Sequence, residues 1–163
     1  MNIFTVPYSS RHFYCRPDTS LNRDSNDYFC PDGVNRLAAA VFIYVRASKA
    51  GKSVSSKFAG RYYTTAGTGV QFYAPELEDA CSHESWWISR SLDNSTFLLG
   101  DEHPAEELPE VIKEKINAAF ETVSRHVSFR TGDYVAIEIE PPITVPETEC
   151  TFTINGKVLN IIR

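Results

Sequence analysis

The chain has 163 residues, of which 42% are hydrophobic and 23% charged, a balance typical of one globular domain. Its formal net charge is −5 and both signs are scattered along the sequence, which argues against the clustered basic surface that nucleic acid requires. No apolar run approaches the roughly 20 residues of a membrane-spanning helix. We therefore expect a single domain, residues 1–163, that binds neither nucleic acid nor a membrane.

The first half of the chain predicts strands separated by polar loops. Residues 2–6 and 11–15 fit short strands, and residues 16–33 fit a loop rich in Pro, Asp, Asn and Ser. Residues 37–47, LAAAVFIYVRA, favour a buried strand because they are apolar and include β-branched and aromatic side chains, although periodicity alone also allows a buried helix. Residues 64–74 predict a second strand, whose glycines imply a bulge or a close backbone approach.

Helical segments are expected in the middle of the chain. Residues 53–60 predict one or two turns, with Ser53 as N-cap and Gly60 as the stop, and residues 75–81 predict a short turn. The clearest helix is 108–126, where apolar residues recur at steps of three and four. This apolar stripe consists of Leu108, Val111, Ile112, Ile116, Phe120, Val123 and Val127.

The C-terminal segments again predict strands. Residues 134–140, YVAIEIE, alternate apolar and polar side chains as a half-buried strand does. Asn155 and Gly156 separate two apolar runs and form the strongest short hairpin signal, which pairs Phe152 with Leu159. Cys150, Phe152, Leu159 and Ile161 are expected on the buried face. The elements together indicate an α+β domain, mostly β, with one long helix.

The four cysteines, Cys15, Cys30, Cys81 and Cys150, are widely spaced and form no CxxC pair or zinc-ligand pattern. The first residues, MNIFTVPYSSRH, lack the basic and long apolar stretches of a signal peptide. Free, buried thiols in a cytoplasmic protein are therefore the favoured interpretation. Two disulfides in an exported protein are the alternative.

Several of these segments, in this order, resemble the fumarylacetoacetate hydrolase family. FYCRPDTSL, residues 13–21, resembles an early family strand that runs into Lys-Pro-Asp, and residues 33–78 resemble the family's core stretch of two strands that carry metal ligands. Residues 86–100 resemble its strand with a lysine before an Asp-Gly turn, and residues 123–142 resemble the helix, Gly-Asp turn and strand that precede its Gly-Thr-Pro loop. The resemblance implies the mixed β-sandwich or roll of the family's C-terminal domain.

Family members bind one divalent cation, Mg²⁺ or Mn²⁺, through carboxylates, because a hard cation prefers oxygen ligands. A Glu-x-Glu on the core strand supplies two ligands on one face, and an Asp on the next strand supplies a third. By the resemblance these positions are Leu37, Ala39 and Gln71, which should converge on the rim of one cavity. Since residues 37–45 contain no acid, we expect neither cation to bind and no catalytic residue of the family kind to remain.

Other family positions have also changed. The resemblance places Arg16 and Arg90 where the family has lysines, Asp93 in the turn, and Glu140 at the start of the EPP sequence that replaces Gly-Thr-Pro. These four residues are the expected pocket. Together with Arg61, the two arginines suit an acidic ligand, since a guanidinium matches a carboxylate. A structural pair between Arg90 and Asp93 is the simpler interpretation.

Two neighbouring groups leave alternatives open. Glu76, Asp79 and His83 would share one side of a helix, either as a solvated acidic face or as a new metal site. Trp86 and Trp87 lie in a segment that fits a helix or a strand. They indicate core or dimer packing, or else a recognition surface.

The sequence therefore predicts a non-catalytic relative of the family, a pseudoenzyme with a ligand-binding or partner-binding role. The alternative is a divergent hydrolase, isomerase or decarboxylase that acts on a small 2-oxo or acylpyruvate-like acid. Since family members usually dimerise, we expect a homodimer, or a hetero-oligomer with an intact family paralogue.

Overall fold

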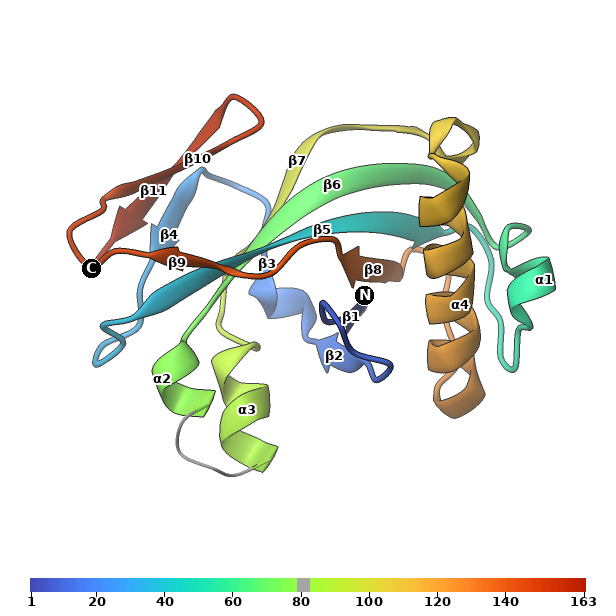
Figure 1. The fold of residues 1–163 in the computed structure, drawn as a ribbon, viewed down its shortest axis with the longest axis horizontal. Helices are drawn as coiled ribbons and strands as arrows, with labels where there is room; N and C mark the ends of the chain where they lie inside the picture. Colours follow the sequence, from blue (N-terminus) through green and yellow to red (C-terminus); the bar gives the residue numbers. More distant parts are fainter. Residues whose placement is uncertain (79–82) are drawn as a thin grey trace.

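A computed structural model describes residues 1–78 and 83–163. Figure 1 shows long arched strands, with helix α4 (Glu110–His126) across one end and a smaller sheet at the other. The large sheet has the order β2-β1-β8-β5-β6-β7-β3, with β9 also paired to β5, and the small one has the order β10-β11-β4. The strands are β1 (Ile3–Val6), β2 (Tyr14–Arg16), β3 (Leu21–Asn22), β4 (Asp27–Phe29), β5 (Leu37–Ala47), β6 (Tyr63–Tyr73), β7 (Thr96–Pro104), β8 (Tyr134–Glu138), β9 (Ile143–Val145), β10 (Thr151–Ile154) and β11 (Lys157–Ile162).

The two longest strands, β5 and β6, form the centre of the large sheet and confirm both strand predictions. They run antiparallel, and the glycines of β6 lie opposite aromatic residues of β5: Gly69 opposite Phe42 and Gly67 opposite Tyr44. A Cβ atom on Gly69 would lie 2.9 Å from the carbonyl oxygen of Phe97 on β7. The predicted close approach is therefore confirmed, since the rings occupy the space above the glycines.

Helix α4 confirms the long predicted helix and covers one face of the sheet. Ile116, Phe120 and Val123 are fully buried there, and Phe120 packs on Phe129 with ring centroids 4.6 Å apart. Val111 was expected on the same stripe but is 63% exposed. At 100° per residue it is turned away from the buried face. In the described part of the chain, no helix is long and apolar enough to cross a membrane.

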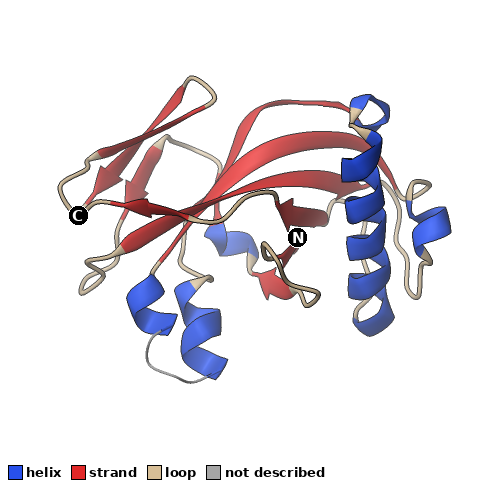
Figure 2. Cartoon of the chain, viewed as in Figure 1, coloured by secondary structure: helices blue, strands red, loops and turns tan. Residues whose placement is uncertain are grey.

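The shorter helices are α1 (Ser56–Ala59), α2 (Pro75–Glu78) and α3 (His83–Ser89), and Figure 2 shows α2 and α3 beneath the long strands. Gly60 ends α1 as predicted, but the N-cap is Ser55 and not Ser53. Ser53 has a φ of 53°, so it occupies a left-handed turn before the helix. Two further short helices of the 3₁₀ type, η1 (Asp18–Ser20) and η2 (Ala105–Glu107), lie in connections.

The small sheet confirms the predicted hairpin. Asn155 and Gly156 have φ values of 50° and 76°, as a two-residue hairpin turn of the primed type requires, and Phe152 pairs with Leu159. Cys150 was expected to be buried but is exposed, because it lies just before the first residue of β10. The predicted loop 16–33 contains β4, whose parallel pairing with β11 depends on a distant segment.

Strand β8 differs from the half-buried strand that its alternation predicts, since all five of its residues are buried. Val135 and Ile137 face the apolar cluster beneath α4, whereas Tyr134 and Ala136 pack in a second cluster on the opposite face. The strand also lies between β1 and β5. Glu138, which the alternation places in water, is therefore buried.

Candidate functional site

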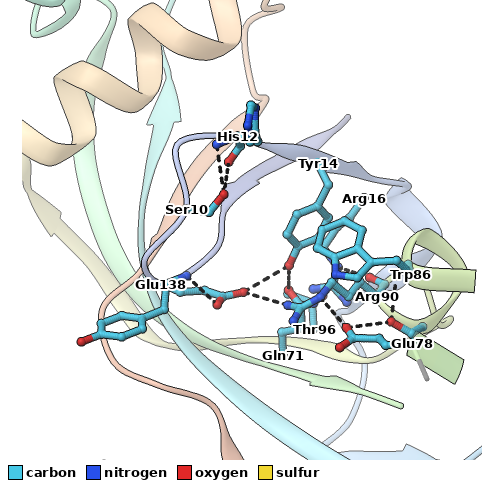
Figure 3. A network of polar contacts seen from close by, with 12 residues as sticks. Ser10, His12, Tyr14, Arg16, Gln71, Glu78, Trp86, Arg90, Thr96 and Glu138 are labelled. Atoms are coloured by element: carbon cyan, nitrogen blue, oxygen red, sulfur yellow. Dashed lines mark hydrogen bonds and ion pairs between the residues drawn. The ribbon is translucent and has the colours of Figure 1, made fainter. Parts of the chain in front are cut away.

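The sheet face opposite α4 carries a cluster of buried polar side chains, which we call the polar network. Strands β2, β6, β7 and β8 each contribute, and α2, the end of α3 and the turn after it close it from the side (Figure 3). Its members come from both ends of the chain. They are Tyr14, Arg16, Gln71, Glu78, Arg90, Ser95, Thr96 and Glu138.

Arg90 forms the centre of this network. Its Nη1 lies 3.1 Å from Oε1 of Glu138, and its Nε donates to Oε1 of Glu78 at 2.8 Å. The side chains of Arg90 and Glu138 are 7% and 1% exposed, so this ion pair is almost entirely removed from solvent. Such a pair stabilises the fold only while both partners are present, because either charge left alone would be buried without compensation.

Aromatic rings enclose the same guanidinium. Its carbon lies 4.1 Å from the ring centroid of Tyr73, 5.0 Å from that of Trp86 and 5.6 Å from that of Tyr14. Tyr14 and Trp86 meet edge to face at 5.2 Å. These distances are in the range of cation–π contacts, so Arg90 is held by ring faces as well as by carboxylates.

Arg16 is fully buried and is held by neutral acceptors. Its Nε donates to the backbone carbonyl of Arg90 at 2.8 Å, its Nη2 donates to the Ser95 hydroxyl at 2.7 Å, and its Nη1 donates to the Thr96 hydroxyl. Burial lowers the pKa of Arg16 to about 10, which leaves the side chain charged at neutral pH. Arg16 therefore ties β2 to the turn between α3 and β7 and fixes the backbone of Arg90.

Tyr14 connects the network to the middle of the sheet. Its hydroxyl lies 2.8 Å from Oε1 of Gln71 and 3.4 Å from Oε1 of Glu138. Burial raises the pKa of the Tyr14 hydroxyl, so it remains a neutral hydrogen-bond donor. The Nε2 atom of Gln71 is buried and has no hydrogen-bond partner among the described residues.

Opposing effects act on the charge of Arg90. Burial alone would lower its pKa, but the attraction of Tyr14, Glu138 and Glu78 outweighs burial and raises it. Arg90 is therefore a permanent cation, with two carboxylates that neutralise it together with Arg16. The two negative and two positive side chains of the network therefore balance one another.

The structure does not bring Leu37, Ala39 and Gln71 together. Gln71 pairs with Ala40, and neighbouring residues along a strand point to opposite faces. Leu37 and Ala39 consequently lie in the apolar cluster on the other face, beside buried residues of β6 and β7. The residues of β5 that share the face of Gln71 are Ala38 and Ala40, one position later than the family resemblance places the two ligands.

This corrected face is no better suited to a divalent cation. Ala38 and Ala40 offer no ligand atom, and the amide oxygen of Gln71 is bonded to Tyr14. The nearby carboxylate of Glu138 is already paired with Arg90. Across residues 1–78 and 83–163, no group of three or more His, Cys, Asp or Glu side chains is arranged to hold a metal ion.

The four expected pocket residues divide into two pairs. Arg16 and Arg90 meet in the polar network, whereas Asp93 and Glu140 are exposed and lie outside it. Asp93 occupies a surface turn, and Glu140 lies two residues after the end of β8. The carboxylates that pair with Arg90 are Glu78 and Glu138 instead.

The remaining candidates have other positions. Glu76 accepts the backbone N–H of Asn35 at 2.6 Å, so it holds a loop, and Asp79 lies outside the described residues. Arg61 is on the surface, where it stacks on the Phe58 ring at 4.9 Å. Of the two tryptophans, Trp86 belongs to the enclosure of Arg90, while Trp87 is 49% exposed.

Sequence comparison alone gives no match, either with a protein-family model or with a curated protein. The structure, in contrast, is similar over 99% of the chain to several solved structures. Fumarylpyruvate hydrolase from Pseudomonas aeruginosa, solved with Mn²⁺ and pyruvate, has a TM-score of 0.76 at 14% identity, with 89% of its own length covered.

Two further structures agree. A protein assigned to the fumarylacetoacetate hydrolase family from Yersinia pestis CO92 has a TM-score of 0.76 at 16% identity, with 91% of its length covered. The 5-carboxymethyl-2-hydroxymuconate delta-isomerase from Mycobacterium smegmatis has a TM-score of 0.73 at 12% identity, with 78% covered. The chain therefore has the fold of the fumarylacetoacetate hydrolase family, and the predicted α+β, mostly β architecture is confirmed.

Proposed function

We propose that this protein is a non-catalytic protein with the fold of the fumarylacetoacetate hydrolase family, and that it has a binding role. The observation that carries the proposal is the composition of the sheet face around Gln71. Ala38 and Ala40 place no carboxylate on β5 beside Gln71, and the same network holds the permanently charged guanidinium of Arg90.

Electrostatics support the same conclusion. A dication beside Gln71 would have to approach two guanidinium groups, those of Arg16 and Arg90, in a region shielded from solvent. Like charges at a few ångström repel by several kcal/mol at a protein's effective dielectric constant. The two nearby carboxylates, Glu78 and Glu138, already compensate the buried charge of Arg90, so a cation that drew them away would leave that charge without a partner.

The test is a calorimetric titration of the full chain with Mn²⁺ and with Mg²⁺, together with assays for hydrolysis of acylpyruvates and decarboxylation of small 2-oxo acids. Fumarylpyruvate hydrolase from Pseudomonas aeruginosa serves as the positive control. We expect heats no larger than dilution and no turnover above the uncatalysed rate. Micromolar Mn²⁺ affinity with turnover would overturn the proposal.

A divergent enzyme is the second candidate, supported by the buried Tyr14, Arg90 and Glu138 lying together. In that case turnover without added metal should be lost in Arg90→Met and kept in the matched surface variant Arg61→Met. If the wild type and both variants show no turnover, the divergent enzyme is excluded and the binding role stands.

We further propose a homodimer in the cytoplasm, or a hetero-oligomer with an intact family paralogue. The interface is supported by Trp87 and Ile88 on α3, which are each 49% exposed. The cytoplasm is supported by the free thiols of Cys15, Cys30 and Cys150, which are typical of a reducing compartment. Analytical ultracentrifugation of the wild type and of Trp87→Ser tests the homodimer. A wild-type monomer at high micromolar concentration would contradict it.

A further inference from the structure

A separate groove lies between the segment after β1 and helix α4. Its volume is about 540 Å³, within the range of small-molecule sites. Its apolar lining includes Val6, Pro7 and Ile137 from the sheet side and Ala118 and Ala119 from the helix. Because the two alanines are short, an apolar body can approach the backbone of α4 closely.

The wall formed by residues 7–11 is fixed by hydrogen bonds. The N–H of Ser10 donates to the carbonyl of Pro7 at 3.1 Å, and Ser9 between them has a φ of 59°, in the left-handed region. The N–H of Tyr8 donates to Oε2 of Glu138 at 2.9 Å, so the polar network anchors this wall. A wall fixed before binding lowers the entropic cost of ligand association.

The charges at the groove favour an anion. Arg11 and Lys115 both line it and are exposed, and neither makes an ion pair with a residue of the described chain. Other cations of α4 differ, since Lys113 pairs with Glu110 at 3.4 Å and Arg125 pairs with a glutamate one turn away. The two groove cations therefore remain available to a ligand.

The acidic member of the groove's described lining does not cancel this charge. Glu138 contributes to the lining, but its carboxylate is held by Arg90 and by the N–H of Tyr8. Thr122 also lines the groove and carries a hydroxyl that can donate a hydrogen bond, whereas the Ser10 hydroxyl is bonded to the backbone of His12. The groove thus combines an apolar floor with a cationic rim.

From this arrangement, we propose that the groove binds a small organic anion with an apolar body, such as a short-chain or aryl monocarboxylate. The apolar body lies against Val6, Ile137 and Ala119, and the carboxylate meets Arg11 and Lys115 at the rim. The inference rests on the proposed binding role and specifies the class of ligand. The proposed site lies on the α4 side of β8, whereas Arg90 lies on the opposite side.

The probe is sodium hexanoate, with hexanamide as its uncharged counterpart. Amide chemical shifts of the full-length, isotope-labelled protein are followed during titration to about 10 mM, a range that detects millimolar affinity. We expect saturable hexanoate shifts confined to residues 6–11, 115–122 and 137–138, and binding of hexanamide weaker by about tenfold. Lys115→Gln and Arg11→Gln should each weaken hexanoate binding about threefold to fivefold, the range for a partly exposed charge pair.

Lys113→Gln is the matched control, because it removes a cation from the same helix outside the groove, and it should leave hexanoate affinity unchanged. Saturable hexanoate shifts that the two groove variants weaken and the control does not would establish the site. Absence of saturable shifts, equal affinity for hexanamide, or an equal effect of Lys113→Gln would each overturn it. The proposed non-catalytic role is tested separately, by metal titration and activity assays. A protein that binds no hexanoate can therefore be told apart from one that binds metal and turns over substrate.

Discussion

Replacing Glu138 by Gln should destabilise the protein more than any loss of a surface ion pair. The carboxylate is 1% exposed, lies 3.1 Å from Arg90 and accepts the N–H of Tyr8 at 2.9 Å. Removal of one partner from a buried ion pair costs about 3–5 kcal/mol. Gln keeps an oxygen for Tyr8 but turns a neutral amide toward a buried guanidinium, so we expect a loss near the lower limit, about 3 kcal/mol.

Urea denaturation followed by Trp fluorescence measures this loss as a lower midpoint at unchanged slope. For a chain of this length, about 3 kcal/mol corresponds to a fall in Tm of roughly 6–12 °C. Asp18→Asn is the control, since its ion pair with Arg23 has both side chains 48% exposed and should contribute under about 1 kcal/mol. If Glu138→Gln costs no more than Asp18→Asn, the buried pair does not hold the network together, and the reasoning fails.

Three other perturbations probe the packing, the buried tyrosines and the hairpin. Gly69→Ala should cost about 1–3 kcal/mol in urea unfolding, because the new Cβ meets the carbonyl of Phe97, whereas Gly60→Ala has open space and should change stability by less than about 0.5 kcal/mol; equal effects would contradict the close packing. Burial raises the pKa of six tyrosines, so the stability they contribute is fully present below about pH 10 and is lost as the pH rises through their folded values. Phenolate absorbance of these six should therefore appear together with unfolding, and their ionisation in the folded protein would refute the assignment. The six are Tyr14, Tyr28, Tyr44, Tyr63, Tyr73 and Tyr134. Asn155→Ala should cost about 1–2 kcal/mol at a φ of 50° and speed hydrogen exchange in β10 and β11; unchanged exchange would show that the turn residue does not set the hairpin.

Local patterns were sufficient for the elements whose partners lie nearby in the chain. Strand β5, helix α4 and the hairpin after Asn155 each have a strong apolar period or turn signal, and all three are confirmed. Strand β4 has no such signal. It is three residues long and exists because it pairs with β11 near the other end of the chain.

The site was predictable only in part, because burial depends on neighbours that the sequence does not reveal. Arg16 and Arg90 were identified as members of one pocket, and the structure brings them together. Glu138 was missed because the alternation of residues 134–140 indicates a strand with one wet face, while both faces of β8 are covered. Glu78 had no distinguishing signal, since it lies between the acids Glu76 and Asp79 in the sequence.

The register of β5 against β6 was also not predictable from the sequence, and a shift of one residue exchanges the two faces of a strand. The run of three alanines, residues 38–40, offers no side chain by which to fix the alignment. The paired residues of β6 decide it, and they place Ala38 and Ala40 on the network face.

The strand order also constrains when the site can form during synthesis. β1 and β2 carry Tyr14 and Arg16, yet β1 pairs with β8, which contains Glu138. The hydroxyl of Tyr14 and the carboxylate of Glu138 are separated by 124 residues along the chain. A growing chain on the ribosome can pair β1 with β2, but the other edge of β1 lacks its partner β8 until most of the protein has been made. Such a topology folds slowly, and the nascent chain exposes strand edges that chaperones would be expected to protect.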